Sequence, residues 1–196
     1  MKHLLHKASF TGLVVLLLST TTLINIHAQE SSSSSSPSVH VTSEQLKGEI
    51  KVSLEDAIKL YQETFPNVSI TSIDLTAKLG RYVYQIEGVD DDMEYELTID
   101  AQTKEVSGKR DYPLELDERN GFKRKNDALN LEKLKDLAEI SKVVEQATGS
   151  GQIVEWELDR ELNVTYWKIT LVNGSEKLEL KIDAQTADVL EVELDD

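Results

Sequence analysis

The sequence predicts an α+β protein with two tandem small domains, each a helix packed on one face of a three- to four-stranded antiparallel sheet (αβββ). Three observations support this fold class: an internal repeat, an amphipathic helical stripe at the start of each copy, and period-two alternation in the segments that follow. The predicted domains span residues 48–110 and 131–196, and a linker spans residues 111–130.

The repeat is visible as self-similarity at a fixed offset. Ile99-Asp100-Ala101-Gln102-Thr103 recurs 83 residues later as Ile182-Asp183-Ala184-Gln185-Thr186. A gap-free alignment of residues 52–110 with residues 135–193 gives 15 identities in 59 pairs. Such self-similarity predicts two copies of one fold rather than a single fold spanning the chain.

Each copy opens with a predicted helix. Ser53 is a suitable N-cap, Asp56 lies three residues further on, and Pro66 ends the first helix. In the second copy, Leu131 and Leu134 suggest that the helix starts before Leu137. The apolar stripes consist of Leu54, Ala57, Ile58, Tyr61 and Phe65, and of Leu137, Ile140, Val144 and Ala147.

Three alternating strands follow each helix, and a short final strand is expected at residues 105–107 and 189–194. One face of each sheet is apolar and the other polar, which is typical of a sheet covered on one side only. Asp100 and Asp183 lead the repeated turns, and an Asp there closes an Asx-type turn by accepting backbone N–H bonds. Their predicted role is structural. The positions of the inward face are Ile73, Leu75 and Ala77; Tyr82, Tyr84 and Ile86; Met93, Tyr95, Leu97 and Ile99; Trp156 and Leu158; Thr165, Trp167, Ile169 and Leu171; and Leu178, Leu180 and Ile182.

The N-terminus is typical of an exported protein. Residues 1–28 contain a positive start, an apolar run over residues 10–26 and a small residue at Ala28, as in a secretory signal peptide. The alternative is an uncleaved membrane anchor. Residues 29–47 form a Ser-rich tether that is expected to be disordered.

Composition excludes several function classes. Without the leader, 19 basic residues face 36 acidic ones, a net charge of −17, which opposes binding to nucleic acid. There is no cysteine, so disulfides, thiolate metal sites and lipid attachment to an N-terminal Cys are excluded. All four histidines lie within the first 40 residues, so His-based catalysis and His-ligated zinc are unavailable to the predicted domains. We therefore expect no catalytic, cofactor-binding or metal-binding residues.

Four local features need interpretation, and three of them have an alternative. Asp90-Asp91-Asp92 is a solvated hairpin tip or an oxygen-ligand calcium site, and the first is favoured because the EF-hand spacing is missing. The acids of the alternating segment Glu191-Val192-Glu193-Leu194-Asp195-Asp196 are expected to face water and protect a sheet edge. A basic stretch either offsets nearby acids or grips an anionic wall polymer. Four aromatic residues either pack in the core or line a peptide groove. The basic residues are Lys109, Arg110, Arg119, Lys123, Arg124 and Lys125, and the aromatic ones are Tyr82, Tyr84, Trp156 and Trp167.

The capped helix, three antiparallel strands and closing Asp-x-x-Thr turn resemble the PepSY domain, over roughly residues 50–110 and 131–196. Two copies behind a secretory leader resemble exported PepSY proteins of Gram-positive bacteria. The usual turn motif reads Asp-x-x-Thr-Gly-x-Val, and this chain has Lys104 and Ala187 at the Gly positions. Because glycine adopts positive φ cheaply, this departure leaves the backbone of the turn open.

The resemblance implies a non-catalytic binding or regulatory module, secreted or held at the cell envelope, with a secreted or envelope peptidase as its partner. The alternative is a membrane-tethered structural or sensory protein, with the membrane contacted only through an uncleaved leader. An enzyme would need a carboxylate pair or a Ser-Lys dyad. Because each copy is small, we expect the two to pack on each other or to be only modestly stable. The oligomeric state is left open.

Overall fold

The computed structural model describes residues 50–78, 81–149 and 151–195. The predicted signal peptide (1–28) and tether (29–47) lie outside these described residues. The helices are α2 (Leu54–Thr64), α3 (Phe122–Asp127) and α4 (Leu137–Thr148). The strands are β1 (Ser69–Lys78), β2 (Arg81–Val89), β3 (Met93–Asp100), β4 (Val106–Pro113), β5 (Gln152–Glu161), β6 (Val164–Asn173), β7 (Glu176–Asp183) and β8 (Val189–Asp195).

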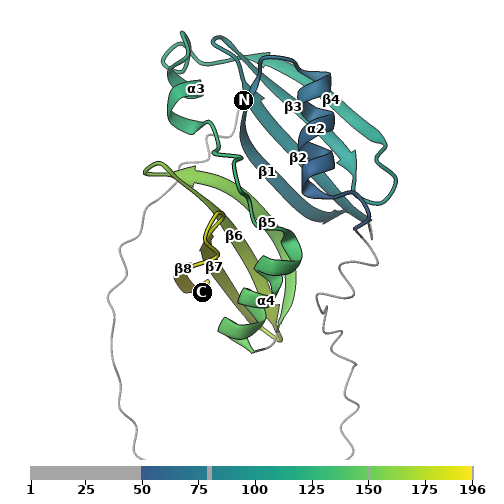
Figure 1. Ribbon diagram of the computed structural model, residues 1–196, viewed down its shortest axis with the longest axis vertical. Coiled ribbons are helices and arrows are strands. Elements are labelled where there is room, and N and C mark those ends of the chain that lie inside the picture. The colour runs from purple at the N-terminus through teal and green to yellow at the C-terminus, as the bar shows by residue number, and fades with distance from the viewer. Residues whose placement is uncertain (1–49, 79–80, 150, 196) are drawn as a thin grey trace, which may run out of the picture. The chain divides into compact units, whose positions relative to one another are not determined.

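All eight strands form one antiparallel sheet in the order β4-β3-β2-β1-β5-β6-β7-β8. Helices α2 and α4 lie on the same face of it, which we call the helix face (Figure 1). The α+β class is confirmed, but the division into two separate αβββ domains is not, because strands β1 and β5 join the two repeats. Each repeat contributes one long helix and four strands.

The joint between the repeats is a short antiparallel pairing that we call the seam. Its register pairs Ile73 with Leu158, Asp74 with Glu157, Leu75 with Trp156 and Thr76 with Glu155. Residues directly opposite in an antiparallel pair share a face. The side chains of Ile73, Leu75, Trp156 and Leu158 are completely buried on the helix face. The expectation that the two copies pack on each other is confirmed.

Equivalent hydrogen bonds recur at the offset of 83. The Ser53 hydroxyl accepts the backbone N–H of Asp56 (3.1 Å), and the Asp136 carboxylate accepts that of Glu139 (2.7 Å). Thus both long helices begin at a side-chain cap. The second helix starts at Leu137, so the prediction of an earlier start was wrong. Lys133 has a positive φ of 56°, which interrupts any helix extending back to Leu131.

The repeated turns close as predicted. Asp100 accepts the backbone N–H groups of Gln102 (2.9 Å) and Thr103 (2.8 Å) through one oxygen. Asp183 does the same for the two equivalent residues of the second turn. Lys104 and Ala187 both adopt a φ of 65°, the conformation that glycine supplies in the usual motif. The turn geometry is therefore kept despite the missing glycine.

The segment between the repeats contains regular secondary structure. Strand β4 extends to Pro113, beyond the short final strand expected at residues 105–107, and α3 occupies residues predicted to form a loop. Arg124 donates to the Ser69 hydroxyl (3.0 Å) and to the Asn67 carbonyl (3.0 Å). The Leu129 N–H donates to the Ile70 carbonyl (2.9 Å), so this segment is attached to β1.

Replacing Ala187 by Gly should stabilise the protein. In the left-handed region, a residue with a Cβ is destabilised by about 1–2 kcal/mol. Glycine avoids this cost but loses more conformational entropy on folding than alanine, which amounts to about 0.5–1 kcal/mol. The free energy of unfolding should therefore rise by about 0.5–1 kcal/mol, measured by urea denaturation. Ala138→Gly within α4 is the control and should lower it by a similar amount. Equal destabilisation by both variants would contradict the assigned turn.

A fragment containing only the first repeat, residues 48–113, should be less stable than the whole chain or should self-associate. It exposes the β1 edge and the apolar residues that β5 covers in the whole chain. We expect it to melt well below the whole chain or to self-associate, measured by circular dichroism and sedimentation. A monomeric fragment that melts as sharply and as high as the whole chain would contradict the importance of the seam.

Candidate functional site

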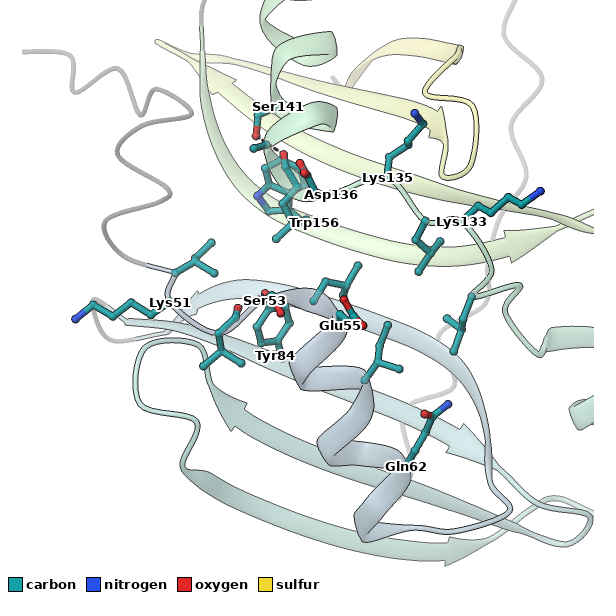
Figure 2. Close-up of a pocket in the computed structure, with 18 residues that line it drawn as sticks. Lys51, Ser53, Glu55, Gln62, Tyr84, Lys133, Lys135, Asp136, Ser141 and Trp156 are labelled. Carbon is teal, nitrogen blue, oxygen red and sulfur yellow. Dashed lines mark hydrogen bonds between the residues drawn. The ribbon is translucent and has the colours of Figure 1, made fainter.

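A groove of about 700 Å³ runs between α2 and α4 on the helix face. Figure 2 shows side chains from both repeats approaching it, with Tyr84 on the side of the first repeat and Trp156 on the side of the second. The lining residues are Ile50, Lys51, Val52, Ser53, Leu54, Glu55, Ile58, Gln62, Tyr84, Leu131, Lys133, Leu134, Lys135, Asp136, Leu137, Ala138, Ser141 and Trp156. Most of this surface is aliphatic or aromatic, which suits an apolar ligand or apolar side chains of a partner.

The groove is built from equivalent positions of the two repeats. Residues 50–55 and 58 correspond, at the offset of 83, to residues 133–138 and 141, and all of them line it. In the seam, Asp74 pairs with Glu157, which is its own equivalent 83 residues later. An approximate two-fold axis therefore passes through this pair. It brings the two helix starts, and the segments before them, together at one place.

The four aromatic residues named from the sequence are buried in the core. Trp156 and Trp167 are completely buried and contact each other edge to face, with ring centroids 6.1 Å apart, which confirms the core interpretation. Trp156 and Tyr84 also form part of the groove lining, whereas Tyr82 and Trp167 do not. The Tyr84 hydroxyl donates to the Val52 carbonyl (3.0 Å), which fixes the segment leading into α2.

Three polar groups on the α4 side of the groove have structural partners. The Asp136 carboxylate caps α4, and the Ser141 hydroxyl donates to the Leu137 carbonyl (2.7 Å). The Lys135 ammonium forms an ion pair with Glu139 (2.8 Å). These groups are engaged in holding α4 rather than arranged as a nucleophile and its base. The chemistry that the groove offers is apolar contact inside a rim of mixed charge.

The other face of the sheet, which we call the open face, carries the Asp74–Glu157 pair at the seam. Burial raises the pKa of Asp74 to about 7, and the charges of Glu157 and Glu87 add to the effect. Glu157 is partly neutralised by Lys168, whose ammonium lies 3.2 Å from it. This carboxylate pair lies across the sheet from the groove, so it does not supply the groove with an acid and a base.

The predicted acidic tip is a tight hairpin. One oxygen of Asp90 accepts the backbone N–H groups of Asp92 (2.9 Å) and Met93 (2.8 Å), and the other accepts the Tyr95 hydroxyl (2.8 Å). Burial raises the pKa of Asp90, but these hydrogen bonds outweigh it and lower the pKa below its usual range. Within residues 50–78, 81–149 and 151–195, no group of three or more acidic or histidine side chains is arranged to hold a metal ion.

The predicted basic stretch is largely paired within the protein. Arg110 lies 3.6 Å from Glu96, Lys123 lies 3.2 Å from Glu118, and Arg124 lies 3.4 Å from Asp91. Lys109 lies 4.8 Å from the centroid of the Phe65 ring, in cation–π geometry. These contacts favour the interpretation that the basic residues offset nearby acids.

Comparison with known proteins places the chain in a family. The family described as "Peptidase propeptide and YPEB domain" (PepSY) matches residues 51–110 and 129–193, so the chain belongs to the PepSY family and carries two copies of its domain. No catalytic family is indicated. Among curated proteins, the chain has no significant match.

A solved structure resembles the whole two-repeat arrangement. It is the crystal structure of a "putative lipoprotein" from Clostridium difficile 630, with a TM-score of 0.72 and 32% sequence identity. The match covers 74% of this chain and 95% of that one. In the part of the chain that the structure describes, no helix is long and apolar enough to cross a membrane.

The sequence indicated only some of the residues that line the groove. It named Tyr84 and Trp156 as aromatic candidates, but it placed Leu131 and Leu134 in a helix and missed Ile50 and Val52. The repeat offset of 83 residues could have pointed to these two residues. Ile50 and Val52 precede the first cap just as Lys133 and Lys135 precede the second.

The stability of the seam should depend on pH through Asp74. Its carboxyl titrates near pH 7 in the folded protein and near 3.9 when unfolded. The folded state then holds the extra proton between these values, so the free energy of unfolding falls as pH rises from about 4 to about 7. Asp74→Asn should remove this fall and stabilise the protein at pH 8 by about 1–3 kcal/mol.

Urea denaturation from pH 4 to pH 8 measures this effect, and a carbon-13 NMR titration reports the Asp74 carboxyl directly. Glu157→Gln removes the opposing charge and should lower the pKa of Asp74 by part of the shift. The assignment fails if the wild-type and Asp74→Asn profiles run parallel across the whole range.

Proposed function

We propose that this protein is an exported, non-catalytic binding module of the cell envelope that restrains or tunes a secreted peptidase through the groove between α2 and α4. The observation that carries the proposal is the groove itself. It is a mostly apolar depression of about 700 Å³ whose walls come equally from both repeats. Ser53 and Asp136 cap the two helices and Ser141 bonds to the backbone of α4, which suits binding better than chemistry.

Export is supported by three independent features. Residues 1–28 have the pattern of a secretory leader. The matching family is described as "Peptidase propeptide and YPEB domain", and the similar solved protein is described as a "putative lipoprotein". This chain has no cysteine, so its own attachment would rest on an uncleaved leader rather than on a lipid-modified thiol.

A second candidate function follows from that leader. If it is retained, residues 29–47 would space two joined repeats from the membrane, as in a tethered structural or sensory protein. Mass spectrometry of the native N-terminus separates the candidates. A mature chain that starts at Gln29 supports a released module, and an intact leader supports the tethered alternative.

Filling the groove should abolish regulation without unfolding the protein. Ala138 lines the groove from α4, and Ala138→Trp would occupy it. With the purified mature chain and a panel of secreted peptidases from the same host, wild type should change the rate of at least one enzyme. Ala138→Trp should weaken that effect at least tenfold. The measurement is the peptidase rate against a peptide substrate as a function of module concentration.

Gln146→Trp is the matched control, because Gln146 is an exposed residue of α4 outside the groove lining. It should act like wild type. If no peptidase in the panel responds to the wild-type chain, the peptidase proposal is wrong. If Ala138→Trp and wild type act equally, the groove is not the site of regulation.

A further inference from the structure

The two ends of the sheet differ at equivalent positions. Strands β4 and β8 stand at opposite ends of the strand order, and each pairs on one side only within the described residues. On the helix face, Lys109 and Asp111 of β4 correspond to Val192 and Leu194 of β8 at the offset of 83. Val192 and Leu194 are 52% and 65% exposed. One edge is therefore polar and the other apolar at the same place in the fold.

The first edge is covered by its own side chains. Phe65 packs between Tyr61 and Tyr95, with ring centroids 5.3 and 5.0 Å away, and the Lys109 ammonium lies over the Phe65 ring. On the open face, Tyr112 donates to Glu96 (2.6 Å). These contacts cover the edge strand β4 and hinder its pairing with another chain, as is common at the sheet edges of natural proteins.

The second edge lacks this cover. The equivalents of Tyr61, Phe65 and Tyr95 are Val144, Thr148 and Leu178. The Thr148 hydroxyl donates to the Val144 carbonyl (2.9 Å), so it turns back onto α4. Leu178 pairs with Leu194, and Leu180 with Val192, which makes a continuous apolar row from the core to the exposed edge.

The open face of the same edge is acidic. Lys181 forms an ion pair with Glu191 (2.7 Å), and Glu193 lies directly opposite Glu179 in the register. The hydrogen bond and charge of Glu191 raise the pKa of Glu193. Lys177 contacts Glu179 (3.5 Å), so Glu179, Glu191 and Glu193 lie together on this face of the edge. A cation added beside β8 would be attracted to these carboxylates.

We propose that β8 is a docking edge for an extended segment of another protein in which apolar residues alternate with Lys or Arg, added as a ninth strand. The apolar side chains would cover Val192 and Leu194 on the helix face, and the basic ones would face Glu191 and Glu193. Strand addition supplies backbone hydrogen bonds for affinity and alternate side chains for specificity. The inference rests on the proposed binding role, but it does not require the partner to be a peptidase.

Charge selects this occupant over a second copy of the chain. Two β8 strands placed side by side would bring Glu191 and Glu193 of both copies together, and directly opposed like charges destabilise a sheet. The chain carries a net charge of −15, so self-association starts from repulsion. A basic, alternating segment is attracted by the same field.

The test uses the mature chain and a synthetic, end-blocked probe, Lys-Val-Lys-Val-Lys-Val-Lys, followed by fluorescence anisotropy. The wild-type protein should bind it, with nitrogen-15 amide shifts concentrated in β7 and β8. Val192→Lys combined with Leu194→Asp transplants the β4 residues onto β8 and should weaken binding at least tenfold. A probe with alternate N-methylated amides should also bind at least tenfold more weakly, because it cannot complete the ladder.

Val106→Lys is the matched control, because Val106 lies on β4 at the opposite edge and is also partly exposed. It should leave probe binding unchanged. Circular dichroism verifies that each variant folds. The proposal is overturned if wild type does not bind, if the transplant variant binds equally, or if the shifts map to the groove or to β4.

Other occupants of β8 also give distinct results. A wild-type dimer that the transplant dissociates would identify a second copy as the occupant. Probe binding that appears only after residues 29–49 are removed would identify the chain's own segment. Either result overturns the proposal. The transplant variant and the wild-type chain are also compared in the peptidase assay, which separates the two hypotheses. If the wild-type chain binds the probe at β8 but changes no peptidase rate, only the proposed peptidase role is refuted.

Discussion

The pairing of Asp74 with Glu157 across the β1–β5 seam is the constraint on which the rest of the structure depends. These two residues are equivalent in the repeat, so their pairing places an approximate two-fold axis at the centre of the eight-stranded sheet. The axis puts α2 and α4 on one face and brings their N-terminal starts toward each other. Because β1 and β5 pair with each other, they lie inside the sheet, and β4 and β8 are its edge strands. The groove and the exposed edge both follow from this one register.

The seam combines opposite contributions on its two faces. On the helix face, Ile73, Leu75, Trp156 and Leu158 are completely buried, and each such side chain contributes about 1.5–3 kcal/mol. On the open face, two carboxylates are opposed in a partly buried setting, which raises the pKa of Asp74 and costs free energy at neutral pH. Four buried apolar side chains outweigh one unfavourable pair. The register is therefore set by the apolar face, and the acidic pair is accepted as its consequence.

The sequence predicted the parts of this fold that are encoded locally. The cap at Ser53, the Asx turns at Asp100 and Asp183, and the alternating strands all depend on residues a few positions apart. The seam has no such local signal, because β1 and β5 alternate like the other strands and nothing in their residues specifies that they pair. The same limit applies to the groove, since Ile50 and Leu134 line one depression only once the repeats are joined. The earlier helix start was predicted because Leu131 and Leu134 have helical spacing, which the positive φ of Lys133 overrides.

Joining two copies through a symmetric seam leaves their edges free to differ. A β-sheet that ends in two identical apolar edges would extend without limit, whereas two polar edges would offer nothing to a partner. Here the first copy has Phe65 and Lys109 to close its edge, and the second has Thr148 and Val192 at the same places. Phe65 and Thr148 stand at the C-terminal ends of α2 and α4, and Lys109 and Val192 lie on the two outermost strands, so changes at these positions leave the seam untouched. One edge is thus specialised for solubility, and the other remains available for recognition.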